Sequence, residues 1–151
     1  MQQITPCLWF DNTAEEAANF YVSVFPNSKI IDVMHSAADT PSGPKGMVLT
    51  VSFEINNQQF LALNGGPHFK LNEAVSFIVK CKDQEEIDKY WSQLSSVPQS
   101  EQCGWCKDKF GLSWQIVPEN MGELVNSEAS MKAMMEMKKI DIAKLKEAAN
   151  A

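Results

Sequence analysis

The sequence lacks the features that mark a secreted, membrane or nucleic-acid-binding protein. No apolar run is long enough to cross a bilayer, and the first residues do not combine a basic stretch with an apolar one, as a secretory signal does. No basic stripe is present, because 13 Lys and Arg residues stand against 19 Asp and Glu residues and the net charge is −6. We therefore expect a cytoplasmic protein that binds neither nucleic acid nor a membrane surface.

Cysteine is scarce, and its arrangement does not indicate a metal centre. Of four cysteines, Cys103 and Cys106 form a single C-x-x-C. A structural zinc site would need a second such pair, and a redox pair would need a helix N-terminus where a strand is expected. Without a secretory signal we expect free thiols, and we interpret the C-x-x-C as structural packing.

A glycine-rich loop between a strand and a helix is also missing, and with it the usual site for a methyl-donor nucleotide. Histidine is limited to His35 and His68. An isolated histidine usually lies on the surface. His68 follows Gly65-Gly66-Pro67 at the mouth of the cavity predicted below, so it stays a candidate ligand contact.

What is present indicates one globular domain, since 151 residues with 44% apolar side chains can enclose a substantial core. Thr13 and Glu16 form a capping box, which predicts a helix over 14–25. Asn56-Asn57 predicts a hairpin turn. Period-two patterns predict strands over 4–10, 28–35, 47–55 and 60–64.

The same order recurs seventy residues later, with a strand over 74–81, a cap at Asp83 and a helix over 84–94. The apolar faces of the two helices correspond position by position: Ala17, Phe20-Tyr21 and Val24 match Ile87, Tyr90-Trp91 and Leu94. We interpret this as an internal duplication of a strand–helix–strands unit. The alternative is a chance similarity of two amphipathic helices.

The domain organisation that follows is a first module over 1–68, a second over 69–120, and a helical extension over 121–151. The extension is rich in methionine, and Asp141 is a candidate cap for its last helix. Methionine-rich helices suit adaptable packing. The extension is therefore interpreted as a covering helical segment, with a functional lid over a pocket as the alternative.

The stretch Cys103–Pro118 predicts the last hairpin of the sheet. Its second strand has two different faces, since Leu112, Trp114 and Ile116 alternate with Ser113, Gln115 and Val117. This alternation predicts helices on the first face and a cavity on the second, with Gln115 at its middle. The turn Lys107-Asp108-Lys109 is expected to lie in water.

Three phrases carry a family resemblance: LWFDNTAEEAANFYVSVFPNSKI at 8–30, LALNGGPHF at 61–69 and GWCKDKFGLSWQIVP at 104–118. With the repeated module, they resemble the PhnB-like branch of the vicinal oxygen chelate superfamily, which includes glyoxalase I, extradiol dioxygenases and fosfomycin-resistance proteins. The branch is often labelled as resembling 3-demethylubiquinone methyltransferase. The resemblance covers roughly the whole chain. It implies an α+β fold, with two β-α-β-β-β modules forming a curved mixed sheet around a cavity.

In metal-dependent members of the superfamily, four ligands stand on the concave face of the sheet. The resemblance places the equivalent positions at Thr5, Asn64, Ala74 and Gln115. Ala74 has no donor, Asn64 is a poor ligand, and only Gln115 is a plausible one. We therefore expect no metal ion and no cofactor.

The function that this indicates is the binding of a small molecule in a metal-free cavity by a homodimer. The resemblance implies that paired modules form the cavity, and the sequence does not decide whether two chains share their modules. Two alternatives stay open, a metal-dependent lyase or dioxygenase that uses Gln115 and a non-catalytic scaffold. The sequence decides neither whether the chain is an enzyme nor which ligand it binds. The predicted lining comprises Thr5, Cys7, Trp9, Asn64, His68, Ser76, Ile78, Ser113 and Gln115.

Overall fold

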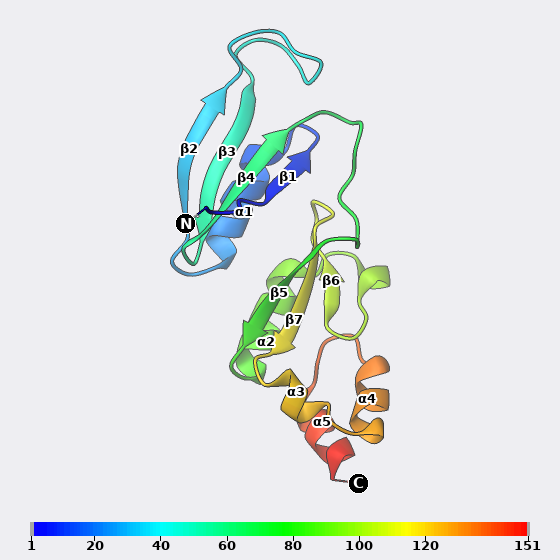
Figure 1. Ribbon diagram of the computed structural model, residues 1–151. Helices are drawn as coiled ribbons and strands as arrows, with labels where there is room; N and C mark the ends of the chain where they lie inside the picture. Colours follow the sequence, from blue (N-terminus) through cyan, green and yellow to red (C-terminus); the bar gives the residue numbers. More distant parts are fainter. Residues whose placement is uncertain (1, 151) are drawn as a thin grey trace. The chain divides into compact units, whose positions relative to one another are not determined.

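The computed structural model describes residues 2–150. The chain forms two compact units, Met1–Leu71 (unit 1) and Asn72–Ala151 (unit 2), each with its own mixed sheet. Figure 1 labels the strands and helices along the chain. This arrangement confirms the predicted α+β class. Within 2–150, no helix is both long and apolar enough to span a membrane.

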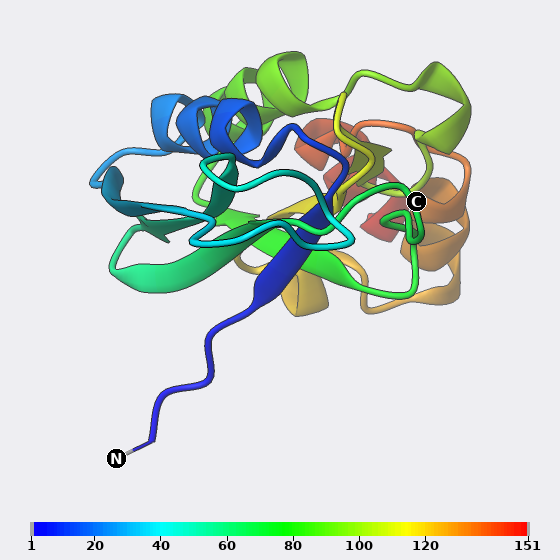
Figure 2. The same ribbon diagram turned by 90° about the horizontal axis from the view of Figure 1, so that it is seen from above.

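Unit 1 is a four-stranded sheet with one helix on one face. The strand order is β1 (Cys7–Phe10), β4 (Gln58–Asn64), β3 (Val48–Ile55) and β2 (Lys29–His35). The β1–β4 pair is parallel and the other two pairs are antiparallel. Helix α1 (Ala14–Val24) packs on β3 and β4, and Figure 2 shows it on one side of the strands. Unit 1 therefore has the predicted β-α-β-β-β order.

Aromatic rings form the centre of the unit 1 core. The Tyr21 ring stacks on Phe53 with 6.1 Å between centroids, and Phe53 stacks on Phe60 at 5.4 Å. Strand alternation brings these rings together, since every second residue of β3 and β4 faces α1. In β1, Leu8 and Phe10 are buried on this face, while Cys7 and Trp9 lie on the opposite one.

The start of α1 is held by a residue from another strand. The predicted capping box of Thr13 and Glu16 is wrong, because the Thr13 side chain makes no capping hydrogen bond. Instead, Asn64 at the end of β4 accepts from the backbone N–H of Ala14 at 2.9 Å, and its Nδ2 donates to the Val48 carbonyl at 2.9 Å. An acceptor distant in sequence therefore satisfies the first helical N–H group.

The β3–β4 turn matches its prediction. Asn56 and Asn57 have φ angles of 46° and 69°, the left-handed conformation that a two-residue hairpin turn requires. Asparagine tolerates this conformation better than most residues. The turn thus fixes the register in which β3 and β4 pair.

Unit 2 repeats this order with one strand fewer. Its sheet runs β5 (Ser76–Cys81), β7 (Ser113–Pro118), β6 (Trp105–Lys107), and α2 (Gln84–Leu94) packs on it. Helices α1 and α2 both have 11 residues and begin seventy positions apart, as the duplication predicts. The second half is therefore β-α-β-β, where the sequence predicted β-α-β-β-β.

The residues between α2 and β6 form a short 3-10 helix (Pro98–Ser100) and a tight turn where unit 1 has its β2 strand. The turn is closed by paired backbone hydrogen bonds between Gln102 and Trp105. The Cys103 and Gly104 amides donate outward, to the carbonyls of Met137 at 2.7 Å and Lys138 at 2.8 Å. A segment of the C-terminal extension therefore occupies this part of the sheet edge.

The two faces of β7 differ as predicted. Leu112, Trp114 and Ile116 are buried, and α2 packs against this strand. The prediction that the whole turn at 107–109 lies in water is wrong, because Asp108 is buried. Asp108 turns inward since it meets three N–H donors there, the amides of Phe110 and Leu112 and the indole of Trp114.

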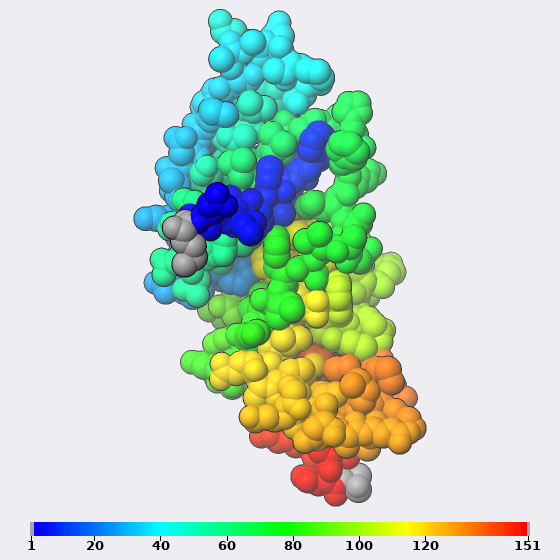
Figure 3. Space-filling model, in the orientation of Figure 1, coloured from blue at the N-terminus to red at the C-terminus, as the bar shows by residue number. Residues whose placement is uncertain are grey.

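Three short helices form the C-terminal extension: α3 (Met121–Leu124), α4 (Glu128–Met135) and α5 (Ile142–Ala149). Helix α4 begins with a capping box of Ser127 and Ser130. Asp141 caps α5 as predicted, accepting from the Lys144 amide at 3.1 Å. In Figure 3 the orange and red residues of α4 and α5 lie beside the yellow residues that precede them in the chain, and α5 contacts both α3 and α4.

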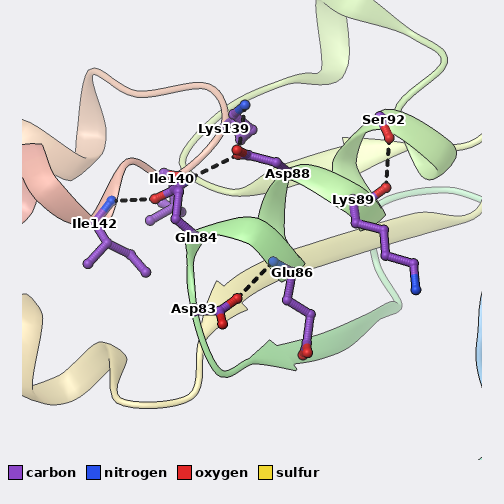
Figure 4. Close-up of polar contacts among 9 residues, drawn as sticks. All are labelled: Asp83, Gln84, Glu86, Asp88, Lys89, Ser92, Lys139, Ile140 and Ile142. Carbon is purple, nitrogen blue, oxygen red and sulfur yellow. Dashed lines mark hydrogen bonds and ion pairs between the residues drawn. The ribbon is translucent and has the colours of Figure 1, made fainter.

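A glutamine of α2 makes two of the hydrogen bonds that join the extension to the rest of unit 2. The Gln84 Nε2 atom donates to the Ile140 carbonyl at 2.9 Å, and its Oε1 atom accepts from the Ile142 amide at 2.8 Å (Figure 4). Lys139 adds an ion pair with Asp88 at 2.9 Å. Since Ile140 is fully buried, the extension is part of the unit 2 core.

Candidate functional site

The nine predicted lining residues fall into two sets, and each set is described within its own unit. The unit 1 set is Thr5, Cys7, Trp9, Asn64 and His68, and the unit 2 set is Ser76, Ile78, Ser113 and Gln115.

Trp9 is the centre of the unit 1 set, and its indole packs on the loop after β4. The Nε1 atom donates to the Gly66 carbonyl at 2.9 Å, and the ring lies so close to Gly65 that a Cβ there would approach it to 2.4 Å. Phe69 meets the indole edge-on at 5.0 Å, while His68 is exposed. Trp9 therefore anchors the loop that carries His68.

The other members of this set do not surround Trp9. Asn64 is buried on the helix face of the sheet, where both of its amide groups are hydrogen-bonded. Thr5 precedes β1 and borders a polar hollow of about 250 Å³ next to the β3–β4 turn. Cys7 is exposed, on the same face of β1 as Trp9.

The structure brings together all four residues of the unit 2 set. In the parallel pairing of β5 with β7, Ser76 stands beside Ser113 and Ile78 beside Gln115. All four lie on the sheet face opposite α2. The Gln115 Nε2 atom donates to Ser76 Oγ at 3.0 Å, which leaves its Oε1 atom available to a ligand.

A hollow of about 420 Å³ opens beside Gln115, and we call it the β7 hollow. Of the residues that line it, the sequence predicted only Ile78 and Gln115. Trp105 could have been found, because it pairs with Gln115 across the hairpin and so shares its face. The alternative interpretation of the methionine-rich extension as a lid over a pocket was the only signal that its residues, Met121 and Met134, line the hollow. The full lining is Ile78, Lys80, Cys103, Trp105, Gln115, Val117, Pro118, Glu119, Met121, Gly122 and Met134.

Ser113 is 1% exposed, and its hydroxyl has no hydrogen-bond partner among the described residues. It lies on the same face as Gln115, two positions earlier in β7. Its cross-strand neighbour Lys107 forms an ion pair with Glu73. A buried hydroxyl without a partner destabilises a fold by about 1–3 kcal/mol, so a ligand or water atom that reached Ser113 would gain a hydrogen bond.

The C-x-x-C holds two thiols in different environments. Cys103 lines the β7 hollow, while Cys106 is 1% exposed. Burial, with Asp108 and Glu101 nearby, raises the pKa of the Cys106 thiol to about 12. Burial also raises the pKa of Cys81 to about 12. The thiols of Cys81 and Cys106 are therefore protonated at neutral pH and are poor nucleophiles.

The residues at the four positions that correspond to metal ligands do not fit a divalent transition metal. Asn64 uses its amide groups to hold α1 and Val48, and Ala74 offers no donor. Thr5 supplies only a neutral hydroxyl. Over residues 2–150, no group of three or more His, Cys, Asp or Glu side chains is arranged to hold a metal ion.

A family model described as 3-demethylubiquinone-9 3-methyltransferase matches residues 2–117. The chain belongs to this family. The match confirms the resemblance to PhnB-like proteins of the glyoxalase superfamily. It ends within β7, so α3, α4 and α5 lie outside the family model.

Solved structures agree with this family. The PhnB protein from Bacillus cereus is 34% identical, covering 77% of this chain and 99% of its own, with a TM-score of 0.63. Protein PA1353 from Pseudomonas aeruginosa is 17% identical over 78% of this chain and 98% of its own, with a TM-score of 0.58, and it shows the fold alone. No curated protein matches the chain.

Proposed function

We propose that the chain binds a small organic molecule in a metal-free cavity, and that the β7 hollow is part of the binding site. The observation that carries this proposal is the placement of Gln115. Its Nε2 atom donates to Ser76 Oγ, no hydrogen bond from a described residue occupies its Oε1 atom, and the residue lines the hollow. A mostly apolar hollow with a few oriented polar groups is the usual form of a small-molecule site.

Ser113 shares a sheet face with Gln115, and no described residue bonds to its hydroxyl, but it is buried and does not line the β7 hollow, so it is a secondary candidate for contact with a ligand or a buried water. Buried polar groups without a partner are uncommon in folded proteins and often mark places where a ligand or water completes the hydrogen bonding. Gln115, Ser76 and Ser113 thus form a short polar row along β5 and β7.

Methyl transfer, which the family description names, finds no support in the local chemistry. A methyl-donor nucleotide site of the Rossmann type needs a glycine-rich turn between a strand and the next helix. The β1–α1 connection is Asp11-Asn12-Thr13 and the β5–α2 connection is Lys82-Asp83, neither of which contains glycine. A metal-dependent lyase or dioxygenase is disfavoured by the ligand set described above.

The test compares the wild-type protein with Gln115→Ala in a thermal-shift screen against a metabolite library. We expect at least one compound to raise the melting temperature of the wild type, and the variant to lose that shift. Gln93→Ala is the matched control, because Gln93 is exposed on α2. A screen without any hit would favour the non-catalytic scaffold. Metal present in stoichiometric amount and lost from Gln115→Ala would favour the metalloenzyme.

We further propose that the chain forms a homodimer. End strands of both sheets carry exposed apolar side chains, Ile31 and Met34 on β2 and Ile78 on β5. End strands offer unpaired backbone groups to a second chain. The cytoplasmic location and the absence of nucleic-acid and membrane partners stay predictions.

A further inference from the structure

The β7 hollow is lined by residues of the unit 2 sheet and by residues of the C-terminal extension. The sheet supplies Trp105, Gln115 and their neighbours, whereas α3 and α4 supply Met121 and Met134. We propose that the C-terminal extension makes this hollow a site for a neutral aromatic molecule with one N–H or O–H donor. The inference rests on the proposed function and deepens it, because the family model does not include the extension.

The methionine wall is held in place by two hydrogen bonds to the residues that directly follow Met134. The Gln102 Nε2 atom donates to the carbonyl of the next residue, Met135, at 2.6 Å. The Cys103 amide donates to the Met137 carbonyl at 2.7 Å. The end of α4 is thus fixed against the turn before β6, where the hollow has its Trp105 side. Met134 is therefore part of a built wall rather than of a loose helix.

The chemistry of the lining favours aromatic rings. Thioether sulfurs contact ring edges favourably, and Met121 and Met134 bring two of them to the hollow. Trp105 offers an apolar ring surface. The volume of about 420 Å³ lies in the range, roughly 300–1,000 Å³, of typical small-molecule sites.

The polar groups select a neutral molecule with a hydrogen-bond donor. The Gln115 Oε1 atom can only accept, so its complement is an N–H or O–H group, while the second N–H of Nε2, which Ser76 does not use, can donate to an acceptor on the same molecule. The charged lining residues, Lys80 and Glu119, have opposite signs and leave the hollow without net charge. A ligand with a full charge would lose hydration and meet attraction and repulsion together.

Helix α4 offers its own controls. Met134 lines the hollow, whereas Met131 and Met135 are 43% and 50% exposed and are not part of its lining. A lysine at position 134 would bring an ammonium group into the hollow. The same change at 131 alters the same helix without reaching the hollow.

The probe is N-phenyl-1-naphthylamine, a neutral two-part aromatic molecule with a single N–H, titrated into the full chain and followed by its fluorescence. We expect Met134→Lys to weaken probe binding at least about tenfold, because the change replaces an apolar lining side chain with a hydrated ammonium group that an aromatic ring would have to displace or desolvate. Met121→Lys, on a different helix, should do the same, and Met131→Lys should leave binding within about twofold, as for an exposed position. Far-ultraviolet circular dichroism of each variant verifies that it is folded.

The outcomes separate this inference from the proposed function. If Gln115→Ala weakens binding while both lysine variants in the hollow bind like the wild type, the inference about the extension is wrong and the binding function stands. If neither Gln115→Ala nor the lysine variants change binding, both proposals fall. Tighter binding of the anionic analogue 1-anilinonaphthalene-8-sulfonate would overturn the assignment to neutral ligands.

Discussion

The indole Nε1 atom of Trp114 donates a hydrogen bond of 2.8 Å to the Oδ2 atom of Asp108, and both side chains are buried. The other carboxylate oxygen accepts from the amides of Phe110 and Leu112 at 2.8 and 3.1 Å. A carboxylate is tolerated in an interior only when its oxygens are hydrogen-bonded in this way. The contact ties the β6–β7 turn to the core beneath α2.

Replacing Asp108 by Asn should lower the free energy of unfolding by about 1–3 kcal/mol, because the amide cannot satisfy every donor that the carboxylate accepts from. Trp114→Phe removes the indole donor. In the double variant, the two losses should be non-additive by about 0.5 kcal/mol or more, as expected for direct partners. Urea unfolding of the four proteins gives this coupling energy. Additive losses would contradict a direct Asp108–Trp114 interaction.

The buried thiols predict a loss of stability at high pH. Burial raises the pKa of Cys106 from 9.0 to about 12, so the folded state keeps this proton after the unfolded chain has released it. The free energy of unfolding that the protonated Cys106 thiol contributes is complete below pH 9. It is lost as the pH rises toward 12, at up to about 1.4 kcal/mol per pH unit. Urea unfolding at several pH values, repeated on Cys106→Ala, should give a flatter slope for the variant.

The same pKa values predict slow alkylation. At pH 8 the thiolate fraction of Cys81 and Cys106 should be roughly a thousandfold lower than for a thiol of ordinary pKa. Iodoacetamide should therefore modify Cys7 before either buried thiol, because Cys7 is exposed, although partial burial raises the pKa of its thiol as well. Peptide mass spectrometry gives the order, with urea-unfolded protein as the control. Equal rates in the folded protein would contradict the prediction.

Alanine should have opposite effects at Gly65, which contacts Trp9, and at Gly122, which has open space around it. Gly65→Ala would place a Cβ 2.4 Å from the indole, and the resulting overpacking should destabilise unit 1 by about 1–3 kcal/mol. Gly122, in α3, has no atom within 4 Å of such a Cβ, so Gly122→Ala should stabilise by up to about 1 kcal/mol. Thermal unfolding with tryptophan fluorescence distinguishes the two.

Self-association predicts a species of twice the chain mass, about 33.8 kDa, from a chain of 16.9 kDa. Sedimentation velocity at micromolar concentration measures this directly. Ile78→Lys should shift the distribution toward the monomer, because Ile78 is 56% exposed on an end strand. A monomer at all concentrations of the wild type would refute the homodimer.

The sequence predicted correctly those features of the fold that follow from the alternation or the spacing of neighbouring residues. The alternation along 112–117 placed Leu112, Trp114 and Ile116 correctly on the buried face, although Ser113 on the other face is buried as well, and the positions of both helices agree with the seventy-residue offset. What the sequence did not indicate depends on distant partners. Asn64 caps a helix fifty residues away, and Asp108 is buried because Trp114 meets it in the folded turn.

In the candidate site too, local patterns predicted some residues, whereas the position of others depends on segments distant in sequence. Strand parity placed Ser76 and Gln115 on one face, and their side chains are hydrogen-bonded there. Met121 and Met134 were missed because their position depends on how the extension folds back, which no periodicity encodes. The absent strand of unit 2 was missed for a related reason, since Cys103 and Gly104 pair with residues 137–138.

The hydrogen bonds between Gln84 and residues 140 and 142 imply an order in which the two units fold during synthesis. Every strand and helix of unit 1 lies before residue 72, so this unit can fold while the rest is still being translated. The core of unit 2 contains Ile140 and Leu145, so its last contacts form only after those residues have left the ribosome. Until then, the apolar surface that they cover stays open to chaperones.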